Sequence, residues 1–153
     1  MNDVRTPQQG EIITQPPRQQ AGGQSPRTGV FLCRCGGSIS AVVDVDALAR
    51  ETRGMPGVVH VEVHEYPCMG RGLAAVKAAI REHSLDRVVV AGCTPRTHRA
   101  GFRQVLRDAG INPGGLEIAN LREQCALVHP GGGSEAQRKA IETVRMAAAR
   151  VAA

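Results

Sequence analysis

The stretch that decides the fold is RVVVAGCTPRTHRAGF, residues 87–102. Residues 88–91 are apolar without interruption, which predicts a strand buried on both faces of a parallel sheet. A helix pattern follows at once, because Thr94 suits an N-cap and Pro95 suits the first helical position. Cys93 therefore stands at the carboxyl end of a strand, the edge at which open α/β sheets bind ligands. The positive end of the helix dipole is expected to favour the Cys93 thiolate over the thiol.

Cysteines also follow the other three predicted strands. The strands and their cysteines are residues 29–33 with Cys33 and Cys35, residues 58–66 with Cys68, and residues 116–121 with Cys125. Glycines in these corners, such as Gly36 and Gly37, permit tight turns and leave room for a bulky group beside the backbone.

Apolar residues at helical spacing separate the strands, and Asp44 or Asp46 is expected to cap the first of these helices. The buried stripes are Val45, Leu48 and Ala49; Leu73, Val76, Ala79 and Ile80; Ala100, Phe102, Val105, Leu106 and Ala109; and Ala140, Ile141, Val144, Ala148 and Val151. Alternation of strand and helix implies right-handed crossovers. The expected fold is α/β, a four-stranded, mainly parallel sheet with flanking helices, similar to the Rossmann and flavodoxin folds.

Composition narrows the class of protein. A chain of 153 residues is expected to form one domain, residues 29–153, behind a disordered tail, residues 1–28, that is rich in Gln, Pro, Gly and Arg. The net charge of +5 would suit nucleic acid, but two Phe, one Tyr and no Trp leave few rings for base stacking, so we expect no nucleic-acid partner. No apolar run approaches the roughly 20 residues that cross a bilayer, which predicts a cytoplasmic protein without membrane contact.

The cysteines are expected to converge. Parallel pairing brings all strand ends to one edge of the sheet, with neighbouring strands about 4.8 Å apart. Five cysteines is an odd number in a chain without a visible secretion signal, which favours metal or redox chemistry over disulfides. Thiol-only ligation suits an iron–sulfur cluster or zinc. The plain alternative is that each cysteine is a small buried hydrophobic residue.

The polar residues of the alternating second strand are His60, Glu62 and His64, which lie on one face of that strand. Two histidines at this spacing would suit a metal, but a regular polar phase on an edge strand favours a solvated face. We interpret these side chains as a solvated face.

Three segments carry a family resemblance: residues 29–37 (GVFLCRCGG), residues 87–102, and residues 119–129 (ANLREQCALVH). They resemble the N-terminal domain of HdrA, the iron–sulfur flavoprotein of heterodisulfide reductase, and the resemblance covers residues 29–153. It implies a domain that binds a 4Fe-4S cluster and precedes a flavin domain of thioredoxin-reductase type. By resemblance, the family's cysteine positions are Cys33, Cys35, Cys68, Cys93 and Cys125.

The chain also departs from that family. Thr97-His98-Arg99-Ala100 stands where the family has Thr-His-Glu-Pro, and no Gly-x-Gly-x-x-Gly fingerprint follows a strand. We therefore expect FAD on a partner chain of the HdrA type. The resemblance implies further redox partners: ferredoxin, HdrB-like and HdrC-like subunits, or a hydrogenase or dehydrogenase.

Four side chains are candidates for support of the cluster. Arg34, Arg96 and Arg122 lie near the cysteines and would compensate anionic thiolates, and His98 lies within the first turns of its helix. The alternative for the arginines is a solvated surface charge. The leading hypothesis is an electron-transfer module with no substrate pocket. The rivals are a zinc-stabilised assembly module and a thiol-dependent redox or sulfur-transfer protein that uses Cys93.

Overall fold

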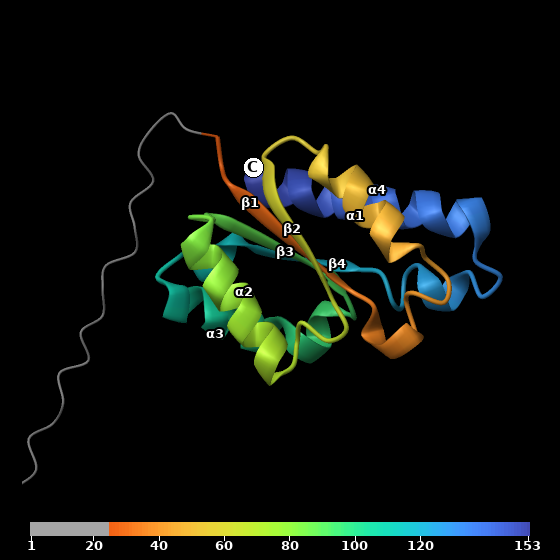
Figure 1. The fold of residues 1–153 in the computed structure, drawn as a ribbon, viewed down its shortest axis with the longest axis horizontal. Coiled ribbons are helices and arrows are strands. Elements are labelled where there is room, and N and C mark those ends of the chain that lie inside the picture. The colour runs from red at the N-terminus through yellow and green to blue at the C-terminus, as the bar shows by residue number, and fades with distance from the viewer. Residues whose placement is uncertain (1–24) are drawn as a thin grey trace, which may run out of the picture.

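The computed structural model describes residues 25–153 and shows one four-stranded sheet (Figure 1). All three strand pairs are parallel, and the strand order is β2-β1-β3-β4. The strands are β1 (Thr28–Cys33), β2 (Val58–His64), β3 (Arg87–Gly92) and β4 (Leu116–Asn120). The helices are α1 (Val45–Arg53), α2 (Gly70–Glu82), α3 (Pro95–Ala109) and α4 (Gly133–Ala152), with short 3-10 turns η1 (Cys35–Gly37), η2 (Pro113–Gly115) and η3 (Ala126–Val128). The predicted α/β fold is confirmed.

Burial along the strands follows their place in the sheet. Every residue of the inner strand β1 is buried, as is β3 after its first residue. The edge strand β2 is only partly buried, which agrees with the alternation that predicted an edge. The pattern of polar residues along a strand thus indicated its position in the sheet.

The helices cover the sheet in two layers, α1 with α4 on one face and α2 with α3 on the other (Figure 1). Leu48 and Val144 belong to the core of the first face, and Ile80 and Phe102 to the core of the second. The predicted stripes are confirmed except at Ala100, which is exposed. Because all four strands are parallel, every strand ends at the same edge of the sheet.

Two helix ends show how local sequence sets the corners. Asp44 caps α1, since its side chain accepts a hydrogen bond from the backbone N–H of Ala47 at 2.8 Å. Thr94 occupies the N-cap position of α3 as predicted, but its side chain makes no capping hydrogen bond. The N-terminus of α3 therefore needs a partner from elsewhere.

The start of the domain differs from the sequence prediction. The predicted tail lies mostly in residues 1–24, outside the described residues. Thr28 is already the first residue of β1 and is 1% exposed. The Arg27 guanidinium donates to the backbone carbonyl of His83 at 3.0 Å, and the Arg27 N–H donates to Asp86. The ordered domain thus includes residues that the sequence pattern placed in the tail.

Among residues 25–153, no helix has the length and apolar character needed to cross a membrane.

Candidate metal centre

Four cysteine side chains meet at the edge where the strands end. Cys33 is the last residue of β1, Cys35 begins η1, Cys68 precedes α2, and Cys93 lies between β3 and α3. The Sγ atoms of Cys35 and Cys93 are 3.6 Å apart although the residues are 58 positions apart in sequence. The fold therefore places thiols from three separate corners in one region.

Cys33 and Cys68 are the other members of this group, because they line one small cavity together with Cys93. Burial raises the pKa of Cys33 to about 12, against a hydrogen bond from the Cys35 backbone, and the charges of Cys35, Cys93 and Cys68 raise it further. Burial also raises the pKa of Cys68, and the charge of Cys35 adds to that shift. We call Cys33, Cys35, Cys68 and Cys93 the thiol group.

The turn that presents Cys35 depends on unusual backbone angles. Cys35 has a φ of 53° and Gly36 a φ of 54°, both in the left-handed region. A Cβ atom on Gly36 would collide with the hydroxyl of Tyr66. Glycine is therefore favoured at position 36, because it adopts this backbone angle without strain and leaves the Tyr66 side chain in place.

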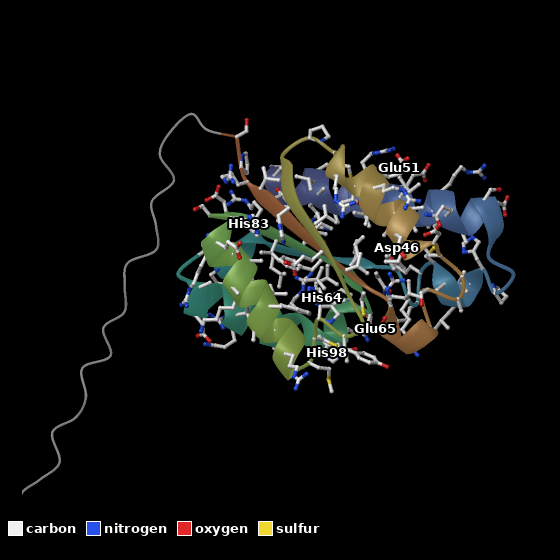
Figure 2. All side chains as sticks on the ribbon, viewed as in Figure 1. Asp46, Glu51, His64, Glu65, His83 and His98 are labelled. Atoms are coloured by element: carbon white, nitrogen blue, oxygen red, sulfur yellow. The ribbon has the colours of Figure 1, made fainter. Side chains whose placement is uncertain are left out.

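A small cavity adjoins the thiol group, and three of the four cysteines line it. Its lining residues are Cys33, Pro67, Cys68, Val90, Gly92, Cys93, Thr94, His98, Phe102 and Ile118. The lining is mostly apolar, with the thiols and His98 as its chemically active groups. His98 thus lines the site, as expected of a side chain that supports the cluster, and Figure 2 shows it at the same end of the domain as Glu65.

Cys125 lies apart from the thiol group. Its thiol is buried and donates to the backbone carbonyl of Ala136 at 3.2 Å, within the core beneath α1 and α4. Burial raises its pKa, and Lys139 opposes the shift, with no contribution from another cysteine. His129 binds back to this corner, because its Nδ1 lies 2.8 Å from the carbonyl of Cys125. The structure brings together four of the five cysteines that were expected to converge.

The predicted arginines differ in their surroundings. Arg34 Nη2 donates to both carboxylate oxygens of Asp46, at 2.7 and 2.9 Å, and Arg34 Nε is 3.6 Å from Glu65 Oε1. Figure 2 shows those two carboxylates near this end of the domain. Arg96 is exposed. The charge of Arg34 is thus largely matched by carboxylates.

Arg122 is the predicted arginine whose electrostatics involve the thiol group. Its pKa is raised first by a hydrogen bond to Glu123, at 3.1 Å, and then by the charges of Cys35 and Cys93. A positive charge therefore lies within electrostatic reach of two of the four thiols.

The expected Cys93 thiolate is not supported. Burial raises the pKa of Cys93 to about 12, a hydrogen bond with Cys35 and the charge of Glu123 raise it as well, and Arg122 opposes them. The first N–H of the α3 region, that of Thr94, donates to Glu123 at 2.8 Å instead of serving the sulfur. The raised pKa disfavours the thiolate that a nucleophilic Cys93 would need.

Sequence reasoning missed Glu123 and Tyr66. Glu123 lies directly before Gln124 and Cys125 in the run Asn-x-Arg-Glu-Gln-Cys, and this run indicated only a family motif. Tyr66, 50% exposed, covers the Gly36 turn from the next corner. Both residues lie close to a cysteine in sequence, and this proximity could have drawn attention to them. It does not predict which residue each of them contacts.

The interpretation of the second strand as a solvated face is wrong. The Glu62 carboxylate bridges two histidine rings, with Oε1 3.0 Å from His60 Nε2 and Oε2 2.7 Å from His64 Nε2. The His60 and His64 side chains are only 14% and 20% exposed. His60 also stacks on His83 at 4.0 Å between centroids. The rings pack against α2 and Phe31 because the strand's polar phase faces the helix layer.

The spacing of the donors bears on the kind of metal. Within residues 25–153, no three His, Cys, Asp or Glu side chains approach closely enough to hold one metal ion. Four thiolates around a single zinc would stand about 3.8 Å from one another, given Zn–S distances of about 2.3 Å. The sulfurs of Cys35 and Cys93, 3.6 Å apart, lie close to that spacing.

Comparison with known proteins identifies the family. No protein-family model matches the chain. Similar proteins are the HdrA iron-sulfur subunit of the CoB–CoM heterodisulfide reductase of Methanocaldococcus jannaschii, 43% identical over 126 residues, and the HdrA subunit of the ferredoxin:CoB–CoM heterodisulfide reductase of Methanosarcina acetivorans, 48% identical over 104 residues. These matches cover 82% and 68% of this chain but only 19% and 13% of the relatives. Over most of its length the chain is homologous to HdrA subunits of heterodisulfide reductases, and it spans less than one fifth of the length of these curated relatives.

Proposed function

We propose that residues 29–153 form an iron–sulfur domain that relays electrons through a 4Fe-4S cluster held by Cys33, Cys35, Cys68 and Cys93. The observation that carries the proposal is the meeting of these thiols at one sheet edge, with 3.6 Å between the sulfurs of Cys35 and Cys93. Four thiolates are the usual ligand set of such a cluster. The name of a relative, which calls that protein an iron-sulfur subunit, supports an iron–sulfur centre.

The residues around the thiol group suit this cofactor. When bound, the cluster supplies one-electron oxidation and reduction. Phe102, Val90 and Ile118 line the adjoining cavity with apolar side chains that exclude water from the sulfurs. Arg122 provides positive charge toward Cys35 and Cys93, which compensates the anionic thiolates. His98 lines the same cavity and offers an N–H donor.

Electron carriers on other polypeptides complete the proposed role. The names of the relatives describe heterodisulfide and ferredoxin reductases, so we place this domain in a redox complex of that kind. FAD on an HdrA-type partner chain is the proposed neighbour in electron transfer. Ferredoxin, HdrB-like and HdrC-like subunits, or a hydrogenase or dehydrogenase are the proposed further partners.

Anaerobic reconstitution of the full chain with iron and sulfide tests the proposal. We expect a brown protein with about four irons and four sulfides per chain, and an EPR signal after reduction with dithionite. One zinc and no colour would instead support the structural-zinc alternative. A metal-free protein with one rapidly alkylated thiol would overturn the electron-transfer role.

A further inference from the structure

The segment after β4 is fastened onto the corner that carries Cys93. The backbone N–H groups of Leu121 and Arg122 both donate to the carbonyl of Gly92, at 2.8 and 3.0 Å. Glu123 completes the contact, because its Oε2 accepts from the N–H of Thr94 at 2.8 Å. The two residues that flank Cys93 are thus both held by the same short segment.

The Glu123 side chain is itself fixed in place. Its Oε1 accepts from Arg122 Nη1 at 3.1 Å, so both carboxylate oxygens have a donor. Its backbone N–H donates to Asn120 Oδ1 at 3.0 Å, which anchors the turn. The side chain is 32% exposed. A carboxylate with a donor on each oxygen, on an anchored turn, is a preorganised hydrogen-bond acceptor.

Glu123 performs the capping function that Thr94 does not. The Thr94 side chain makes no hydrogen bond at the N-terminus of α3. A carboxylate at a helix N-terminus is favourable, because it satisfies a free N–H and faces the positive end of the dipole. Here the cap comes from a different corner of the sheet, and it therefore couples α3 to the segment after β4.

We propose that Glu123 is a positioning residue that holds the Cys93 corner in its ligating geometry, and that its negative charge, opposed by Arg122, sets the reduction potential of the centre. The second part rests on the proposed function. The Glu123 carboxylate lies beside Cys93, because it accepts from the N–H of the next residue, Thr94, at 2.8 Å, and the Arg122 guanidinium lies 3.1 Å from the same carboxylate. Removing the negative charge should therefore stabilise the reduced, more negative centre and raise its potential.

Amide hydrogen exchange at Thr94 tests positioning without any metal. In Glu123→Gln the amide oxygen still accepts from Thr94, so protection should stay near that of the unmodified chain. In Glu123→Ala the acceptor is lost, and exchange at Thr94 should be about tenfold faster or more, as expected for a lost charge-assisted hydrogen bond. Glu142→Gln, on the exposed surface of α4, is the matched charge control and should leave the rate unchanged. Equal protection of Thr94 in Glu123→Ala and the unmodified chain would overturn the positioning role.

Redox titration of the reconstituted chain tests the charge. Glu123→Gln should bind as much iron as the unmodified chain and have a more positive midpoint potential, whereas Arg122→Gln should shift the potential to more negative values. Glu142→Gln should leave it unchanged. Identical potentials in Glu123→Gln and the unmodified chain would refute the electrostatic part. If the unmodified chain binds no iron, the proposed function fails, while the exchange experiment still decides the positioning role.

Discussion

The loops after β3 and β4 leave the sheet in the same way, but they place their cysteines in different surroundings. Both follow a buried parallel strand, and both contain a cysteine at the same edge of the sheet. Cys93 comes directly after Gly92, the last residue of β3, and its sulfur meets Cys35. Cys125 comes five residues after Asn120, the last residue of β4, and its thiol meets the carbonyl of Ala136 in the core. Parallel topology brings a loop with a cysteine to the edge of the sheet. The length of the connection between strand and cysteine then decides whether the thiol joins the thiol group or enters the core.

The largest expected difference between the two corners is in iron binding. Cys93→Ser should lose most of the iron after anaerobic reconstitution, because a cluster that loses one of four thiolates is poorly held. The fold should persist, since Cys93 lies outside the two main cores. Iron per chain and far-UV circular dichroism measure the two outcomes. Full iron content in Cys93→Ser would contradict the ligand assignment.

Alkaline pH should weaken the metal-free thiol group. The pKa of Cys33 is raised from 9.0 to about 12 in the folded chain, which means that the folded state retains a proton that the unfolded state has lost. Its stabilisation is therefore fully present below pH 9 and is lost as pH rises toward 12. For one thiol the free energy of unfolding should fall by up to about 1.4 kcal/mol per pH unit within this window.

Urea denaturation at several pH values measures this slope. Cys33→Ser should flatten it, because serine does not titrate there and its hydroxyl can replace the thiol as donor to the Glu65 carbonyl. An unchanged slope in Cys33→Ser would show that other groups govern the alkaline transition.

Backbone strain at η1 provides a smaller effect. Gly36→Ala should cost about 1–2 kcal/mol from the positive φ alone, and more because its Cβ meets the Tyr66 hydroxyl. Gly37→Ala is the matched control: its φ is 95°, but no atom lies within 4 Å of the added Cβ. The melting temperature and the iron content should both fall further in Gly36→Ala. Equal losses in the two variants would mean that Tyr66 yields freely.

Much of this arrangement was predictable from sequence, for a physical reason. Period-2 and period-3.6 patterns report burial, and burial is what arranges strands and helices into layers, so the sheet and its helices followed from residues such as Val88, Leu48 and Phe102. Parallel topology predicted that all five cysteines converge, and the structure brings Cys33, Cys35, Cys68 and Cys93 together but leaves Cys125 in the core. The spacing of apolar residues does not predict the path of the loop that connects a strand to the next helix.

The residues whose surroundings were predicted wrongly lie in loops or depend on contacts between distant side chains. The spacing of apolar residues describes neither. Cys125 was misplaced because its connection passes into the core beneath α4. Thr94 is the N-cap of α3 as predicted, but its partner Glu123 was missed because it comes from 29 positions away. His60 and His64 were taken for solvated side chains because a polar phase looks the same whether it faces water or a bridging carboxylate such as Glu62.

The smallest effect is expected at Cys125, and it separates a core residue from a ligand most cleanly. Cys125→Ala removes the hydrogen bond to Ala136 and leaves a small void, which should cost about 1 kcal/mol of stability. Iron content should stay equal to that of the unmodified chain, because this thiol does not belong to the thiol group. Cys125→Ser keeps a donor for the Ala136 carbonyl and should lose less stability than Cys125→Ala. Loss of iron in both variants, without a matching loss of stability, would make Cys125 a ligand and would require the connection after β4 to swing back to the edge when the cluster binds.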